Sequence, residues 1–193
     1  MQVRFWGTRG SLPIALTGVG VRHKVKQALL QANGRCFADD AAIEHFIDTE
    51  LAFPIQQSYG GNSACVEMGA GNEYIIRDMG SGLRSLGQQL MLEHGPGKPQ
   101  VYNIFLSHVH WDHIMGLPFF PPAYIPGNRL RIHGVHPLDV LREALLRQHS
   151  DPCFPVQWHQ LGASIELIHL EPEQWYDMNG FRIKAKRQPH HGD

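Results

Sequence analysis

The stretch LSHVHWDHIMG, residues 106–116, constrains this chain more than any other part of its sequence. It begins at the end of the apolar run VYNIFLS, which predicts a short buried strand. Three histidines and one aspartate then fall between His108 and His113. The chain has 13 histidines in 193 residues, and an H-x-H-x-D-H spacing is expected by chance roughly 0.003 times in such a chain. We therefore expect a metal site here, and not a histidine-rich surface.

The spacing within this stretch indicates how its side chains are divided between two metal ions. His108 and His110 are two residues apart, so on an extended segment their side chains point the same way and can reach one ion. If a helix begins directly afterwards, Asp112 and His113 leave that line and face a second ion. Neutral imidazole suits zinc or iron, and a carboxylate adds compensating charge. The stretch therefore predicts ligands for up to two ions.

Two other segments supply candidates for the same site. Asp78 ends the predicted strand YIIRD and precedes a glycine-rich turn, where a carboxylate is well placed to orient metal-binding histidines. The alternative for Asp78 is a residue that stabilises the turn itself. The segment QPHHGD supplies His190 and His191 after another predicted strand. The alternative for these two is a polar chain terminus.

Strands and helices alternate through the rest of the chain. Strands are expected over residues 1–7, 63–69, 73–80, 101–107, 130–135, 164–172 and 180–188, and helices over 81–95 and 136–150. The segments 63–69 and 73–80 are expected to form a β-hairpin. This order favours sheets packed on each other and covered by helices on the outside, an α/β (α+β) fold. Periodicity alone leaves the order of the strands open.

Residues 14–54 interrupt this pattern with a predicted helical insertion. One helix is expected over residues 19–33, with Val21, Val25 and Leu29 on its buried face. A second helix is expected to begin at Asp39 or Asp40, either of which suits the N-cap. The insertion is long for a connection inside a domain, so we expect it to pack as a small unit of its own, to cover a cleft or to form a dimer contact.

Composition excludes several classes of protein. The formal net charge is −1, which argues against a protein held on nucleic acid by bulk positive charge. A metal ion could still bind a phosphate-containing substrate. No apolar run reaches the length of a membrane span. The three cysteines, Cys36, Cys65 and Cys153, are too sparse for a disulfide framework. We therefore expect a cytoplasmic enzyme or binding protein with no membrane partner.

Several motifs together resemble those of the metallo-β-lactamase superfamily. They are SHVHWDH, RDMGSGLRSLG before it and HHGD after it. The segments RFWGTRGSLP, YGGNSACVEM, LPFFPPAY and DPCFPVQW are similar to a narrower branch that includes ribonuclease Z and class II cyclic-nucleotide phosphodiesterases. The resemblance covers most of the chain outside residues 14–54. It implies an αββα sandwich with a binuclear metal centre at one edge.

The resemblance also implies a role for each candidate residue. His108, His110 and a histidine of the third motif would bind the first ion, and Asp112 and His113 would begin the second. The third motif of the branch usually reads N-H-P-G-G, which aligns His190 with the ligand and His191 with proline, so we prefer His190. Asp78 would support the site. The implied cofactor is Zn2+, with Mn2+ or iron as alternatives.

The implied activity is metal-dependent hydrolysis of a phosphodiester by attack of a metal-bound hydroxide. Asp112 would position the attacking water and accept its proton. The substrate would be a small-molecule or nucleotide-like phosphodiester, and nucleic acid stays open. The alternatives are a hydrolase of thioesters, lactams or nucleic acid, and a metal-binding domain without catalytic activity.

The superfamily normally adds a bridging aspartate and a final histidine after the third motif, whereas this sequence stops at Asp193. We therefore expect residues 1–193 to form a single domain whose sandwich is incomplete at the C-terminus and whose second ion binds weakly. Strand edges and apolar faces left open in this way favour association, so a homodimer is expected.

Overall fold

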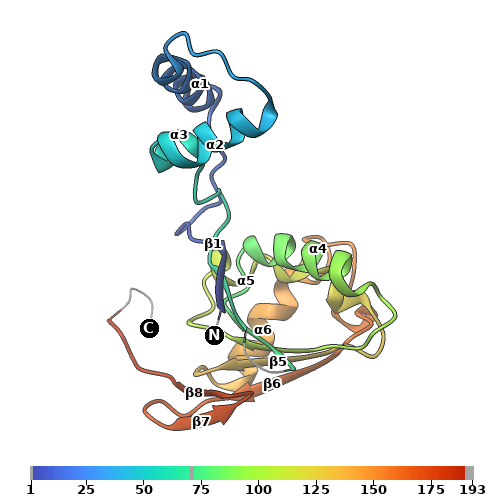
Figure 1. Cartoon of the computed structure of the whole chain (residues 1–193). Helices are drawn as coiled ribbons and strands as arrows, with labels where there is room; N and C mark the ends of the chain where they lie inside the picture. The colour runs from blue at the N-terminus through green and yellow to red at the C-terminus, as the bar shows by residue number, and fades with distance from the viewer. Residues whose placement is uncertain (1, 70–71, 190–193) are drawn as a thin grey trace. The chain divides into compact units, whose positions relative to one another are not determined.

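The computed structural model describes residues 2–69 and 72–189. Close contacts divide the chain into two units, residues 14–61 and the remainder. The larger unit is built on one six-stranded sheet, whose strand order is β1-β2-β3-β4-β5-β6 (Figure 1). The strands are β1 (Gln2–Gly7), β2 (Cys65–Gly69), β3 (Tyr74–Arg77), β4 (Val101–Phe105), β5 (Arg129–Gly134) and β6 (Ser164–His169). The predicted strands of this sheet are thus confirmed.

The sheet is mixed. Strands β1, β2 and β3 pair antiparallel, and β3, β4, β5 and β6 pair parallel. The parallel strands are joined through α4 (Gly82–His94), α5 (Trp111–Ile114) and α6 (Leu138–Gln148), and through the short 3-10 turns η1 (Leu117–Phe119), η2 (Pro121–Tyr124) and η3 (Trp158–Gln160). Because β3 and β4 run in the same direction, Asp78 and His108 follow them at the same edge of the sheet.

Helices cover one face of this sheet. Leu83, Leu86 and Leu90 of α4 are buried there, as are Leu141 and Leu145 of α6. They pack in one apolar cluster with the strand residues of that face, Ile76, Tyr102, Ile104, Leu130 and Ile132. The helix predicted over residues 81–95 is confirmed, and its three buried leucines share one side because they recur every three or four positions.

A β-hairpin packs on the opposite face. It consists of β7 (Trp175–Met178) and β8 (Phe181–Lys184), which pair antiparallel (Figure 1). Its side chains contact a smaller cluster centred on Ile75, Phe105 and Leu170. β8 lies within the predicted strand 180–188, whereas β7 was not predicted. The mixed α/β architecture with strands packed on strands is the expected fold class.

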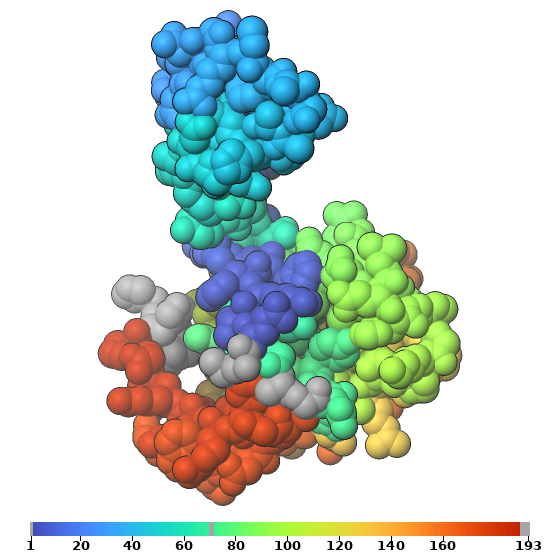
Figure 2. All heavy atoms as spheres, in the orientation of Figure 1, coloured from blue at the N-terminus to red at the C-terminus, as the bar shows by residue number. Residues whose placement is uncertain are grey.

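Strand β1 is at the edge of the six-stranded sheet and pairs with β2 alone. Val3 and Phe5 remain 41% and 68% exposed. The N-terminal residues, drawn in dark blue, lie at the surface of the larger unit in Figure 2. An edge strand with exposed apolar side chains is a surface on which association is expected.

The smaller unit contains three helices. They are α1 (Gly18–Ala32), α2 (Asp40–Glu50) and α3 (Phe53–Gln56), the last of which was not predicted. Thr17 caps α1 and Asp39 caps α2 through their side-chain oxygens, as their positions before the helices require. Asn33 ends α1 in a left-handed conformation, with a φ of 39°.

The burial predicted for α1 is wrong. No residue of this helix is buried, and Val21, Val25 and Leu29 are 48%, 53% and 68% exposed. Within this unit a neighbouring side of the helix makes contacts instead, since Lys24 Nζ donates hydrogen bonds to the carbonyl oxygens of Pro54 and Gln57.

No helix in residues 2–69 and 72–189 combines the length and the apolar character that crossing a bilayer needs.

Candidate metal centre

The candidate histidines lie where β4 gives way to α5. After Phe105 the chain leaves the sheet, runs extended through His110, and enters a single helical turn at Trp111. His110 has φ −61° and ψ 149°, the extended backbone that is normal just before a helix. The predicted change from extended chain to helix between the two halves of the motif is therefore present.

The three imidazole rings of the motif are grouped. The ring centroid of His108 lies 4.5 Å from that of His110 and 4.2 Å from that of His113. The Ser107 hydroxyl lies 3.0 Å from Nδ1 of His108 and 3.2 Å from Nδ1 of His113. With their Nδ1 atoms turned toward Ser107, the two rings direct their Nε2 atoms away from it.

Asp78 lies behind this group. Its side chain is almost fully buried, and one carboxylate oxygen accepts hydrogen bonds of 2.8 Å from both the backbone N–H and the hydroxyl of Ser107. The other oxygen lies 3.0 Å from Nδ1 of His113. The Asp78 carboxylate raises the pKa of His113, while partial burial opposes that rise. These contacts fix the rotation of the His113 ring, which is the arrangement that outer carboxylates give to metal-binding histidines.

The backbone conformation of Asp78 suits this position. Its φ is 62°, in the left-handed region that aspartate and asparagine tolerate better than most residues. Its backbone N–H donates to the carbonyl oxygen of Phe105, the last residue of β4. The turn thus carries the carboxylate directly across to the end of the neighbouring strand.

Asp112 is held from a distant part of the chain. One of its carboxylate oxygens accepts a 2.8 Å hydrogen bond from the backbone N–H of Ser11, 101 residues away in the sequence. The same oxygen lies 3.4 Å from Nε2 of His113. Two ligands of one tetrahedral zinc ion, each at about 2.1 Å from the metal, are separated by about 3.4 Å. The Asp112–His113 pair therefore has a spacing that suits a shared ion.

The candidate residues thus fit a metal ion in two respects: their side chains are of the types that bind metals, and Asp112 and His113 are spaced as two ligands of one ion. In the described ranges 2–69 and 72–189, no three histidine, cysteine, aspartate or glutamate side chains converge on one metal-binding point. His190 and His191, the predicted third motif, lie outside the described residues. Three imidazoles and a carboxylate are nonetheless the ligand types that zinc, iron and manganese sites use.

Sequence reasoning placed the histidines and Asp78 in one region, but it missed the serines that connect them. Ser107 contacts Asp78, His108 and His113, and fully buried Ser63 donates a 2.7 Å hydrogen bond to the carbonyl oxygen of Asp112. A small hydroxyl residue directly before the first histidine was a signal available for Ser107. For Ser63 the sequence offered only its place in the glycine-containing segment YGGNS.

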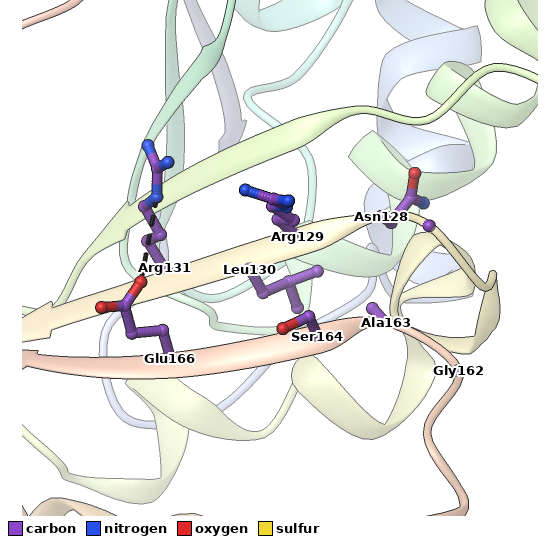
Figure 3. Close-up of a pocket in the computed structure, with 9 residues that line it drawn as sticks. Asn128, Arg129, Leu130, Arg131, Gly162, Ala163, Ser164 and Glu166 are labelled. Atoms are coloured by element: carbon purple, nitrogen blue, oxygen red, sulfur yellow. Dashed lines mark ion pairs between the residues drawn. The ribbon is translucent and has the colours of Figure 1, made fainter.

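A separate cavity of about 470 Å3 lies along β5 and β6 (Figure 3). Arg129, Arg131, Ser164 and Glu166 contribute to its lining, and Arg131 Nε lies 4.0 Å from a carboxylate oxygen of Glu166. His108, His110, Asp112 and His113 do not line it. Its residues lie along the strands, whereas the histidines follow the carboxyl end of β4, so this cavity is not part of the candidate centre.

The sequence of this chain is similar to those of several known proteins. Among curated proteins, the chain is 28% identical over 103 residues to a ribonuclease Z of Exiguobacterium sibiricum, which covers 53% of this chain and 33% of that protein. It is 25% identical over 149 residues to a ribonuclease Z of Haloarcula marismortui, covering 75% and 43% of the two chains. A ribonuclease Z of a Bradyrhizobium species is 27% identical over 144 residues, covering 72% and 43%. The chain thus spans less than half the length of these relatives.

Among solved structures, the chain resembles the metallo-beta-lactamase fold protein YhfI from Bacillus subtilis at a TM-score of 0.41 and 18% identity, over 64% of this chain and 44% of that one. The sequence of residues 59–173 matches the Metallo-beta-lactamase superfamily. That segment is more than half of the 193 residues and contains Asp78 and the whole motif from His108 to His113. The chain therefore belongs to the metallo-beta-lactamase superfamily.

Proposed function

We propose that this protein is a metal-dependent hydrolase of phosphodiester bonds. The observation that carries the proposal is the group of three imidazoles around Ser107, with the buried carboxylate of Asp78 behind it. The family and the ribonuclease Z relatives support the choice of a phosphodiester over a thioester or a lactam. They also favour an RNA substrate over a small nucleotide, although the net charge of −1 offers little bulk attraction for RNA.

The ligands that we propose are His108, His110, Asp112, His113 and His190. A divalent ion held there, zinc in the first instance, would supply Lewis acidity that makes water more acidic and stabilises charge on the leaving group. Asp112 orients the attacking water and accepts its proton. The Ser11 amide holds one oxygen of that carboxylate, which leaves the other oxygen for this task.

The rest of the site would work by fixing orientation. Asp78 holds the ring of His113 and the Ser107 hydroxyl, so His108 and His113 are presented with their Nε2 atoms outward. A ligand set held in this way binds an ion without first losing side-chain freedom. We also propose that residues 1–193 form a single metallo-β-lactamase-like domain, into which the helical segment at about 14–54 is inserted.

Metal content together with turnover tests the proposal. The purified chain, dialysed against zinc and then washed, is expected to retain at least one ion per chain and to hydrolyse bis-p-nitrophenyl phosphate. Replacing His110 by Ala should abolish both, while replacing the exposed His159 by Ala should leave both unchanged. Retained metal without turnover of this substrate or of RNA would favour a catalytically silent metal-binding domain. Turnover that survives complete metal removal would refute the proposal.

We further propose a cytoplasmic location and a homodimer. The cysteines Cys36, Cys65 and Cys153 are all free, as is usual in a reducing compartment. The exposed apolar side chains of the edge strand β1 support association. Light scattering over a hundredfold range of concentration tests the dimer, and a mass that stays near the 21.8 kDa of one chain would refute it.

A further inference from the structure

The hydroxyl group of Ser63 lies at a junction of three segments. Ser63 is 0% exposed and lies just before β2. Its Oγ donates a hydrogen bond of 2.7 Å to the carbonyl oxygen of Asp112 in α5. The same Oγ accepts a hydrogen bond of 2.8 Å from the backbone N–H of Ser81, in the turn that follows β3. One buried hydroxyl thus satisfies a donor and an acceptor on two other segments.

Both of those segments carry candidate site residues. The turn that ends at Ser81 begins with Asp78, and α5 carries Asp112 and His113. The two segments are also joined directly, because the backbone N–H of Met79 donates to the carbonyl oxygen of His113 at 2.7 Å. Ser63 therefore adds a side-chain bridge between these two segments, at Asp112 and Ser81, to the backbone hydrogen bond that joins them at Met79 and His113.

The packing at this junction is too close for adjustment. A Cβ atom added at Gly80 would lie 2.5 Å from the carbonyl oxygen of Asp112 and 2.6 Å from Oγ of Ser63. Added at Gly116, it would lie 2.0 Å from the carbonyl oxygen of Gly80. The two glycines let the turn and α5 approach to this distance, at which the Ser63 hydroxyl can contact both.

Helix α5 cannot hold its own position. It has four residues, a single turn, and an isolated turn of helix is unstable because nucleation is unfavourable. The placement of Asp112 therefore depends on outside contacts: Ser63 at its carbonyl oxygen and Ser11 at its carboxylate. If the carbonyl contact is lost, the hydrogen bonds at His113 and Gly116 still hold the later part of α5. The start of the helix at Asp112 loses one restraint, so the Asp112 and His113 side chains lose part of their alignment.

We propose that Ser63 is a positioning residue for the metal centre, which acts by holding α5 so that Asp112 and His113 stay aligned with the histidines that precede them. Ser63 contacts neither metal nor substrate in this role. The inference rests on the proposed metal-dependent function. Its expected consequence is that loss of the hydroxyl weakens zinc binding about 10- to 100-fold, the effect typical of outer groups that orient metal ligands.

The chain offers a matched control in Ser81. The Ser81 hydroxyl accepts a 3.0 Å hydrogen bond from the backbone N–H of Ser63 and lies 3.1 Å from Oδ1 of Asn62, but no contact joins it to α5. Ser63→Ala and Ser81→Ala therefore each delete one hydroxyl from the same network. Only the first removes a contact with the segment that carries the ligands.

The experiment measures zinc affinity of the native chain and both variants by competition with a chelating dye, and the visible absorption spectrum of each with Co2+. Ser63→Ala is expected to bind zinc 10- to 100-fold more weakly and to give an altered cobalt spectrum. Ser81→Ala should stay within about threefold of the native chain. Equal losses in both variants would show a merely structural role and overturn the inference. Native affinity in Ser63→Ala would also overturn it.

A measurement on the native protein covers the case in which Ser63→Ala does not fold. Because coupling between two sites is reciprocal, zinc should slow hydrogen exchange at the Ser81 amide, whose N–H is bound to Ser63 Oγ. Unchanged exchange there on zinc binding overturns the inference and leaves the proposed function intact. A native chain that binds no zinc at all overturns both.

Discussion

The contacts of Asp78 predict how far two substitutions at this position should lower the free energy of unfolding. Asp78→Asn keeps an oxygen that can accept from the backbone N–H of Ser107, and asparagine tolerates the left-handed φ of 62°. It replaces the charged contact with His113 by a neutral one. Loss of a hydrogen bond to a charged group costs about 1.5–3 kcal/mol, so the free energy of unfolding should fall by about 2 kcal/mol.

Asp78→Ala should lower the free energy of unfolding more than twice as much. It removes the acceptors for the Ser107 N–H, for the Ser107 hydroxyl and for His113, all in a side chain that is 3% exposed. It also places alanine at a positive φ, which costs roughly 1 kcal/mol more. With about 2 kcal/mol for the charged contact to His113 and about 1 kcal/mol for each contact to Ser107, the total loss is about 5 kcal/mol. That is a large fraction of the stability of an ordinary domain.

Urea unfolding followed by tryptophan fluorescence, at pH 7 and with metal removed by chelator, measures both losses. Removal of the metal matters because bound ions would add stability of their own. The order of the two variants is the test. If Asp78→Ala were no less stable than Asp78→Asn, the carboxylate contacts and the left-handed backbone would not be the source of its stabilisation, and the argument would be wrong.

Three other outcomes are expected. Burial lowers the pKa of His133 from 6.5 to about 4. The folded state therefore resists protonation, and the free energy of unfolding falls by roughly 3 kcal/mol as the pH drops from 6.5 to 4. In urea unfolding at several pH values, His133→Phe should flatten this dependence, whereas the control His159→Gln should not. Gly116→Ala places a Cβ 2.0 Å from the carbonyl oxygen of Gly80 and should cost about 2 kcal/mol, while Gly97→Ala, with nothing within 4 Å, should be neutral in the same assay. Zinc at about a hundred times its dissociation constant should add about 2.7 kcal/mol to the stability, and chelator should remove it; no shift of the melting temperature would contradict metal binding to the folded chain.

Local sequence patterns were sufficient to predict the helices and strands that depend on one contiguous segment. The apolar run of β3, the alternation along β5 and the leucine spacing of α4 are properties of contiguous residues, and each of these elements is present. The histidine motif is also contiguous, and its turn from strand end to helix follows its sequence. Strand β7, in contrast, carries Trp175 and Met178 among polar residues, and its pairing with β8 is what makes it a strand.

The contacts that organise the candidate centre were not predictable in this way. Asp78 and Ser107 are 29 residues apart, Ser63 and Asp112 are 49 apart, and Ser11 and Asp112 are 101 apart. Each depends on how strands of the sheet are ordered, and periodicity does not contain that order. The exposed stripe of α1 shows the same limit, since the contacts of this helix with α3 and the residue after it lie about 30 residues away in the sequence.

The edge position of β1 has a consequence for the dynamics of the candidate centre. Ser11, whose amide holds the Asp112 carboxylate, lies four residues after β1, and β1 is bonded to the sheet along one side only. Edge strands are among the first elements to open in local unfolding, with a free energy well below that of global unfolding. Each such opening would release one restraint on Asp112 while the rest of the sheet stays folded. The lifetime of the aligned carboxylate would then follow the fraying rate of the N-terminal strand, and substitutions at Val3 or Phe5 would alter it without touching the centre itself.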